Sequence, residues 1–323
     1  WSWMMAGTLI FIGMPFLYKW IETPNELMLL RLVHGLATAI YGPVTLAWVV
    51  EQGRSGCAER VGWFGIARNG ASLVGPLAAA SLLSFMEPVD VYTIIGCFSS
   101  LALIPVMMLP SGKRKPGLRK SWQGHLSRAF KAGLGLPELW IAGSLECVLY
   151  LGLYAVKAFL PLLALSEGIP ILWVGIFFSM QELTHLLLRP FGGRIGDRFG
   201  YLLTAALGLM FASGALSALP IVPDETSMLG ISMVFGMSQA LILPSCVALF
   251  AARIDQLHTG TGTGLFGSMK NLGKVTGPAL GGWLVHHHQM TWMLWTMSGL
   301  LAFFALGMIT STFGRKLALR VTG

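Results

Sequence analysis

Residues 62–80 of the chain read GWFGIARNGASLVGPLAAA, and residues 264–282 read GLFGSMKNLGKVTGPALGG. At a constant offset of 202 residues, the two stretches share a Gly-x-Phe-Gly start, an Asn four residues later and a Gly-Pro pair. The matched residues are Gly62, Phe64, Gly65, Asn69, Gly75 and Pro76 with Gly264, Phe266, Gly267, Asn271, Gly277 and Pro278, and Arg68 falls opposite Lys270. Asn and Pro are uncommon inside apolar segments, so we interpret the match as an internal duplication.

Both stretches lie in apolar segments that are long enough to cross a bilayer. A hydrocarbon core of about 30 Å takes about 20 residues of helix. We therefore predict an all-α membrane protein with ten transmembrane helices, at 1–19, 27–50, 61–85, 89–109, 138–165, 169–191, 201–221, 227–252, 261–285 and 290–312. The composition agrees, because 54% of the residues are hydrophobic and only 11% are charged, against about a quarter charged in soluble domains.

The connections between these segments alternate in charge. Lys19 is the basic residue of one set, beside acids such as Glu87 and Glu167. The other set carries Arg54, Arg60, Lys113, Arg114, Lys115, Arg119, Lys120, Arg128, Lys131, Arg194, Arg198, Arg253, Arg315, Lys316 and Arg320. Cytoplasmic loops are the basic ones in membrane proteins. The pattern predicts an integral protein, of the plasma (inner) membrane, with both ends of the chain cytoplasmic.

The long basic stretch at 111–137 divides the chain. We predict an N-terminal half at 1–110 with four helices, a cytoplasmic linker at 111–137 and a C-terminal half at 138–323 with six helices. An alternative role for the stretch is contact with anionic lipid head groups. The net charge of +8 falls in such short loops, which favours the bilayer as the partner and excludes nucleic acid.

Motifs for catalysis, cofactors and metals are not found in the sequence. The four cysteines are widely separated, without a CxxC pair. Gly262-x-Gly264-x-x-Gly267 spells a dinucleotide-binding pattern, but no strand precedes it. We therefore predict no enzyme, no cofactor and no metal site.

Residues 193–200, GRIGDRFG, resemble the cytoplasmic loop motif GxxxDRxGRR of the major facilitator superfamily. The matching residues are Gly193, Asp197, Arg198 and Gly200, while Tyr201 and Leu202 stand where the family has two closing basic residues. The resemblance implies a loop between the eighth and ninth helices whose charges hold a cytoplasmic gate closed. The alternative is a tight basic turn.

A second resemblance is to the glycine signature of the family's antiporters, G-x8-G-x3-GP-x2-GG. Gly264, Gly273, Gly277, Pro278, Gly281 and Gly282 reproduce it. Antiporters carry it in the fifth helix, whereas here the intact copy lies in the eleventh, and Ala71, Ala79 and Ala80 replace glycine in the fifth. Residues without bulk let helices approach closely and bend. The resemblance implies a transporter similar to drug/proton antiporters.

The resemblance and the repeat together set the expected helix count. The second half begins near Glu138, and an offset of 202 places its counterpart about 64 residues before Trp1, which is room for two helices. We therefore expect ten of the twelve helices of a major facilitator fold, in two pseudo-symmetric halves that rock about a site at the midplane.

Arg31-Leu-Val-His34-Gly35 resembles the family's fourth-helix motif RxxQGxGAA, with His34 in place of Gln. In proton-coupled relatives the Arg is implicated in proton transfer, which gives Arg31 and His34 a place in a proton pathway. The alternative is that Arg31, close to the outer end of its helix, snorkels to the interface.

Ionisable residues inside the predicted helices are candidates for the transport pathway, because charges at membrane depth are expensive. Glu146, Tyr150, Tyr154 and Lys157 share one helix face, since eleven residues make about three turns; the alternative role is hydrogen bonding between helices. The pathway residues that we predict are Arg31, His34, Arg68, Asn69, Glu146, Tyr150, Tyr154, Lys157, Glu182, His185, Lys270, Asn271 and Lys274.

Three hypotheses about these charges remain open. Arg68 and Glu182 lie at similar depth and are candidates for a salt bridge that breaks as the halves separate. Alternatively, Glu182 or His185 carries the driving proton. A third hypothesis is that Arg68, Lys157, Lys270 and Lys274 attract an anionic substrate.

We interpret the chain as a monomeric secondary transporter whose partners are a small organic solute, protons and the lipid bilayer. Proton-coupled efflux by alternating access is the first hypothesis. The alternatives are an importer or exchanger of organic anions, and a membrane receptor on the same fold that does not transport.

Overall fold

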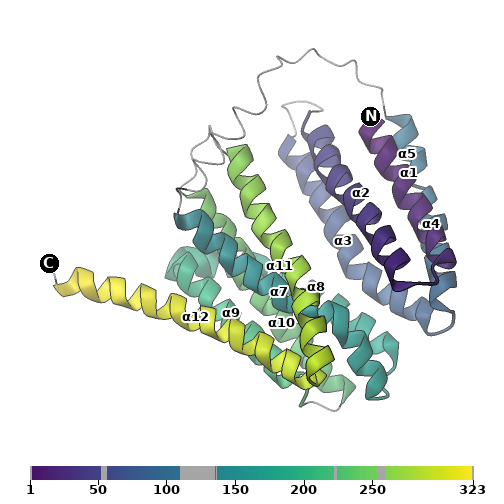
Figure 1. The fold of residues 1–323 in the computed structure, drawn as a ribbon. Coiled ribbons are helices and arrows are strands. Elements are labelled where there is room, and N and C mark those ends of the chain that lie inside the picture. Colours follow the sequence, from purple (N-terminus) through teal and green to yellow (C-terminus); the bar gives the residue numbers. More distant parts are fainter. Residues whose placement is uncertain are drawn as a thin grey trace. The chain divides into compact units, whose positions relative to one another are not determined.

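The computed structural model describes residues 2–51, 57–109, 135, 137–221, 224–252 and 259–321 (Figure 1). Within these ranges every regular element is helical. The elements are α1 (Ser2–Leu17), the 3-10 turn η1 (Tyr18–Trp20), α2 (Pro24–Glu51), α3 (Cys57–Leu83), α4 (Pro88–Ser100), α5 (Leu103–Met108), α7 (Pro137–Ser166), α8 (Ile171–Phe199), α9 (Tyr201–Ala218), α10 (Glu225–Ala251), α11 (Thr259–His287) and α12 (Met290–Val321).

Each predicted transmembrane segment coincides with one of these helices or, in the case of 89–109, with α4 and α5 together. Within the part of the chain that the structure describes, six segments are long and apolar enough to cross a membrane by length and composition alone: Pro88–Met108, α7, α8, α9, α10 and residues Met290–Ser311 of α12. The predicted linker at 111–137 lies outside the described residues, except for residues 135 and 137.

The segment predicted as one helix at 89–109 is interrupted. α4 ends at Ser100 and α5 begins at Leu103. Pro105 has no N–H, so the carbonyl of Leu101 cannot accept the usual helical bond and accepts from Ile104 instead, at 3.2 Å. The two helices together still make one segment, Pro88–Met108, that is long and apolar enough to cross a membrane, as predicted.

The segment predicted at 169–191 is too short, because α8 continues to Phe199. The GRIGDRFG stretch is therefore mostly helical, and the turn into α9 is confined to Gly200. Its φ of +99° is a conformation that glycine adopts without strain. The loop expected at 193–200 is thus the last two turns of a helix and one glycine.

Two compact units make up the chain, residues 1–118 and residues 119–323. Within each unit the helices pair in the same order. α1 packs against α2 and α4, and α9 packs against α10 and α12 (Figure 1). The starts of α3 and α11, at Cys57 and Thr259, are 202 residues apart, as are the starts of α4 and α12, at Pro88 and Met290. The offset found in the sequence therefore holds for whole helices.

The second unit has a continuous apolar core between α7, α9, α10 and α12. Leu149, Leu209, Leu216 and Leu301 are fully buried in it. At Gly152 of α7 the side chains of Leu216 and Leu301 come so close that an added methyl group would lie 3.2 Å from each. Contacts of this kind hold a bundle together in lipid, where packing replaces the hydrophobic effect between helices.

A polar contact joins α9 to α12 within this core. The hydroxyl of Ser213 donates to the carbonyl of Ser298 at 2.9 Å, and the hydroxyl of Ser298 donates to the carbonyl of Ser213 at 2.8 Å. Both side chains are buried. Serine pairs of this kind satisfy polar groups inside a bilayer and fix the register of two helices.

Asp224 caps the start of α10. Its carboxylate accepts the hydroxyl of Ser227 at 2.8 Å and the backbone N–H of Ser227 at 3.0 Å. These bonds, the side-chain one first, lower the pKa of Asp224 below its ordinary value. A lowered pKa stabilises the folded state above the unfolded pKa of about 3.9, and the contribution is lost as the pH falls through the folded pKa.

Asp224→Ala is therefore expected to lower the melting temperature by a few degrees at pH 7, because the cap is lost. The difference from the parent protein should narrow as the pH falls below about 3.9. Thermal unfolding of both proteins at pH 7 and pH 3 measures this. Glu225→Ala, next to the cap, is the control, and an equal difference at both pH values would contradict the assignment.

Candidate functional site

Glycines bring α11 onto the backbone of α7. A Cβ on Gly273 would meet the carbonyl oxygen of Cys147, and one on Gly277 would meet that of Leu151. One turn later a Cβ on Gly281 would lie 2.8 Å from the ring of Phe159. Because the contacts advance in the same direction along both helices, α7 and α11 run parallel and in close contact over three turns.

The glycine signature therefore packs helices at Gly273, Gly277 and Gly281. At Gly282 an added Cβ would make an ordinary contact with Phe159 at 3.7 Å. A Cβ on Gly264, at the start of the signature, or on Gly75 of α3 would meet no described atom within 4 Å. Gly75 and Gly264 thus differ from Gly273, Gly277 and Gly281, which pack tightly against α7.

Lysines from α11 and α7 lie over two tyrosine rings of α7. The Nζ of Lys274 is 5.1 Å from the ring centre of Tyr150 and 5.3 Å from that of Tyr154. Lys270 lies 5.8 Å from the Tyr150 ring, and Lys157 lies 5.2 Å from the Tyr154 ring. An ammonium group over an aromatic face is attracted by the ring quadrupole. We call these five residues the lysine–tyrosine cluster.

Glu146 lies one turn before Tyr150 on α7 and is 3% exposed. Lys270 and Lys274 are close enough to interact electrostatically with its carboxylate, and Cys246 of α10 also lies within range. A buried carboxylate is costly unless it is paired or protonated. Glu146 and the two lysines of α11 are thus a charged group inside the helix bundle of the second unit.

The cluster continues to α8 through Lys157. Its Nζ is 6.0 Å from the ring of Phe178, and Glu182 is close enough to interact with its charge. Glu182 in turn lies 3.5 Å from the Nδ1 of His185, which is buried. Ring contacts, one ion pair and electrostatic interactions thus connect eight predicted residues across α11, α7 and α8: Glu146, Tyr150, Tyr154, Lys157, Glu182, His185, Lys270 and Lys274.

Two buried amides in this region were missed by the sequence reasoning. Gln181 of α8 and Gln239 of α10 are 2% and 4% exposed. The Oε1 of Gln181 and the Nε2 of Gln239 have no hydrogen-bond partner among the described residues. Gly236 of α10 packs against the backbone of Gln181 and His185. A search for every polar residue in the apolar segments, rather than for charges, would have found both.

The predicted proton-pathway residues of α2 have aromatic neighbours. The guanidinium of Arg31 lies 5.3 Å from the ring of Tyr18, and the side chain of Arg31 is exposed. The ring of His34 meets the edge of Phe11 at 5.3 Å, and its buried Nδ1 has no hydrogen-bond partner in the described part of the chain. Arg31 thus lies beside Tyr18 of η1, and both roles predicted for Arg31 stay hypotheses.

The remaining pathway residues lie on α3 and α11. Arg68 of α3 and Asn271 of α11 are exposed, and Asn69 is half-buried. Arg68 and Glu182 belong to different compact units, so their salt bridge stays a hypothesis.

In the predicted gate motif, the carboxylate of Asp197 accepts a hydrogen bond from the hydroxyl of Tyr201 at 2.7 Å. Arg198 lies over the ring of Phe199 at 5.4 Å, and a Cβ added to Gly193 would lie 4.0 Å from the Cβ of Pro244 on α10. Tyr201 therefore binds the acid of the motif from a position where the family has a basic residue.

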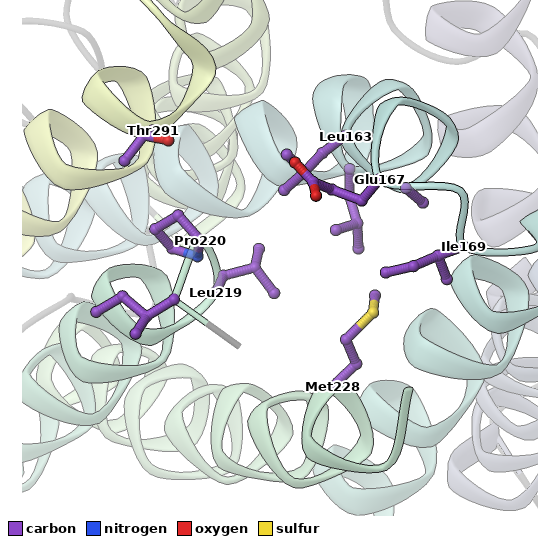
Figure 2. Close-up of a pocket in the computed structure, with 10 residues that line it drawn as sticks. Leu163, Glu167, Ile169, Leu219, Pro220, Met228 and Thr291 are labelled. Carbon is purple, nitrogen blue, oxygen red and sulfur yellow. The ribbon is translucent and has the colours of Figure 1, made fainter. Parts of the chain in front are cut away.

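A cavity of about 150 Å³ lies at the other end of the second unit, where α7 and α9 end and α10 and α12 begin. Its lining is mostly apolar, and Figure 2 shows Glu167 extending over the space between Leu163 and Leu219. Met228 and Thr291 complete it. None of the predicted site residues lines this cavity.

Comparison with known proteins agrees with this architecture. The family model of the Major Facilitator Superfamily matches residues 1–235 and 144–318. A solved structure, the bacterial homologue of the human lysosomal transporter Spinster in an inward-facing and unoccupied conformation, has a TM-score of 0.68 at 15% identity, covering 96% of this chain and 80% of that one. At this identity the likeness is evidence for the fold alone.

Two curated relatives are similar in sequence. The uncharacterized MFS-type transporter YuxJ of Bacillus subtilis is 25% identical over 297 residues, which cover 89% of this chain and 74% of YuxJ. The quinolone resistance protein NorA of Staphylococcus aureus is 24% identical over 157 residues, which cover 48% of this chain and 40% of NorA. Because the family model matches most of its length, the chain belongs to the Major Facilitator Superfamily.

Proposed function

We propose that this chain forms a proton-coupled secondary transporter of a small organic solute, with Glu146 as the group that gains and loses the proton. The observation that carries the proposal is the buried carboxylate of Glu146, close to Lys270 and Lys274 on the neighbouring helix. Ionisable side chains inside a membrane are costly and usually have a function, such as the transfer of a proton.

Alternating access supplies the mechanism. Two repeated halves rock about a central site and expose it to one side of the membrane at a time. Glycine contacts between α7 and α11 leave little side-chain bulk between the helix that carries Glu146 and the helix that carries the lysines. Small shifts between these helices then change the electrostatic interaction of Glu146 with Lys270 and Lys274.

Export in exchange for protons is one direction of transport. It is supported by the antiporter-like glycine signature and by the similarity to a protein named for quinolone resistance. A positively charged solute would then compete with a proton for the carboxylates Glu146 and Glu182.

Transport of an organic anion is the second candidate. It is favoured by the three lysines of the lysine–tyrosine cluster, which outnumber the carboxylates near them. A receptor without transport activity is the third candidate, and it is supported by the fold alone.

Reconstitution into proteoliposomes tests the proposal. With an imposed pH gradient, a fluorescent organic solute is expected to cross the membrane of protein-containing vesicles faster than that of empty vesicles. Dissipation of the gradient with an ionophore should remove this difference in flux. Counterflow without a gradient should persist. Solute binding without flux or counterflow would contradict transport and support a receptor.

The topology and partners follow from the same proposal. We propose a monomer in the plasma membrane, with the ends of this chain and the Asp197–Tyr201 turn on the cytoplasmic side, in contact with lipid, protons and the solute. Cysteines introduced singly at Lys113 and Glu167 are expected to react with an impermeant thiol reagent from the inside and the outside respectively. Labelling of both from one side would contradict the orientation.

A further inference from the structure

The cavity where α7 and α9 end and α10 and α12 begin is separate from the residues that we propose for transport. Its wall starts at Leu160, one turn after Lys157 of the lysine–tyrosine cluster, and includes Glu167. Ten residues, about 15 Å of helix, separate Glu167 from Lys157. Lys157 interacts with Phe178 and Glu182 of α8, which do not line the cavity. The cavity is therefore a second candidate binding site in this unit.

The turn that ends α7 holds the backbone of Glu167 in the cavity wall. Gly168 has a φ of +72°, and the N–H of Ile169 donates to the carbonyl of Ala164 at 2.8 Å. The N–H of Gly168 donates to the carbonyl of Leu165 at 3.3 Å. These bonds form a Schellman motif, in which glycine takes the left-handed conformation after the helix. Ala164 and Ile169 both line the cavity, so hydrogen bonds between wall residues fix the position of Glu167.

The size and the lining of the cavity limit what can occupy it. Glu167 and Thr291 are the polar residues of the lining, and the other described residues around the space are apolar. Figure 2 shows the carboxylate of Glu167 extending over the space, with Leu219 and Met228 beside it. The volume is about 150 Å³, and an apolar cavity of that volume holds one benzene ring. The cavity therefore fits a ligand with a single aromatic ring.

The charged side chains at this end of the second unit are acidic. Glu167 follows α7, and Asp224 and Glu225 stand at the start of α10, whereas residues 158–188, 199–252 and 275–314 contain no Lys or Arg. Asp224 is engaged with Ser227. Glu167 is exposed and forms no ion pair within the described ranges. Helix dipoles contribute both signs, because two helices end and two begin here. The side chains therefore favour a cation.

We infer that this cavity binds a small organic cation with one aromatic ring, the ring within the apolar walls and the ammonium group beside the carboxylate of Glu167. An ammonium group donates charge-assisted hydrogen bonds to a carboxylate, and the hydroxyl of Thr291 is a second acceptor in the lining. Such a ligand would touch α7, α9, α10 and α12 at once. The inference adds a site outside the transport pathway and holds whether or not Glu146 carries the driving proton.

Three ligands with the same ring and different charge test the inference: benzylammonium, benzyl alcohol and benzoate. Binding is measured by ligand-observed NMR titration at pH 7.5, with the protein in nanodiscs of phosphatidylcholine and empty nanodiscs as the blank for partition into lipid. Dissociation constants on the order of 1 mM are expected for ligands of so few atoms.

Benzylammonium is expected to bind about threefold to fivefold more tightly than benzyl alcohol, because an ion pair with an exposed carboxylate such as Glu167 is modest in strength. Benzoate should bind more weakly than benzyl alcohol, because its charge is repelled. Equal or tighter binding of benzoate, or no saturable binding above the blank, would overturn the inference.

Substitutions at Glu167 locate the charge. Glu167→Gln should bind benzylammonium no more tightly than benzyl alcohol, with the affinity for benzyl alcohol unchanged. Glu167→Lys should reverse the order and prefer benzoate. The side chain is exposed, so both variants should fold, and thermal unfolding checks this. Glu225→Gln, an acid at the same end that does not line the cavity, is the matched control and should keep the preference. A preference for the cation that survives in Glu167→Gln would refute the site.

Two further variants separate the cavity from the transport pathway. Ala164→Leu places extra carbon atoms at the cavity wall, so it should weaken the binding of benzylammonium and benzyl alcohol alike; if it does not fold, the Glu167 variants decide. Glu146→Gln should keep the preference for benzylammonium. Loss of that preference in Glu146→Gln, with its retention in Glu167→Gln, would place the cation in the pathway, overturning the inference and leaving the proposed transport standing. Absence of flux and counterflow would refute transport and leave this site intact.

Discussion

Gly277→Leu is expected to prevent stable packing of α11 on α7. A Cβ at this position meets the carbonyl oxygen of Leu151, which is backbone and cannot turn aside. The helices must then separate, which also breaks the contact between Gly273 and Cys147 one turn away. Overpacking costs about 1–3 kcal/mol in side-chain cores and more against backbone, so we expect a loss of at least about 3 kcal/mol.

Thermal unfolding in detergent and elution on size exclusion measure the loss. Gly282→Ala, on the same helix, is the control, because its Cβ makes an ordinary contact with Phe159 at 3.7 Å. It should stay within about 0.5 kcal/mol of the parent. If Gly277→Leu melted at the temperature of the parent, the close approach of the two backbones would be refuted.

The glycine signature illustrates what the sequence can and cannot predict. The spacing of Gly273, Gly277 and Gly281 places all three on one helix face, so close packing was predictable from the period of the helix. The identity of the facing helix was not, because Cys147 and Leu151 are more than 120 residues away in the chain. Local patterns do not contain such contacts.

The positions of the transmembrane helices were predictable from the sequence, but some of their exact ends were not. Segments long enough to cross the bilayer were predictable, because the hydrocarbon core sets the length of a transmembrane helix. Hydropathy missed the break before Pro105, where one absent N–H decides the backbone. It also missed the continuation of α8 through charged residues to Phe199, where the turn depends on the positive φ of Gly200. Single residues determine these two helix boundaries, and hydropathy averaged over a window of residues does not resolve single residues.

The candidate site was predictable as a set of residues but not as an arrangement. The rule that charges in membrane segments are costly selected Glu146, Lys270 and Lys274. The alignment of the lysines over Tyr150 and Tyr154 depends on how α11 lies on α7, which the glycine contacts determine. Neutral amides such as Gln181 escaped that rule because they carry no charge.

Glu146→Gln and Lys274→Gln together are expected to destabilise the protein by less than the sum of the two single changes. Either single change leaves a partly buried charge with less compensation, at a cost of about 1–3 kcal/mol after allowance for the tyrosine contacts. In the double variant, one negative and one positive charge are lost together. Its free energy of unfolding should therefore recover by at least about 1 kcal/mol relative to the sum of the single changes.

Thermal unfolding at pH 8 and low ionic strength measures this cycle. Pairing Glu146→Gln with Lys157→Gln gives the matched comparison, because Lys157 interacts with Glu182 rather than with Glu146. That pair should be additive within about 0.5 kcal/mol. Strict additivity of Glu146→Gln and Lys274→Gln would contradict an electrostatic interaction between these two residues of α7 and α11.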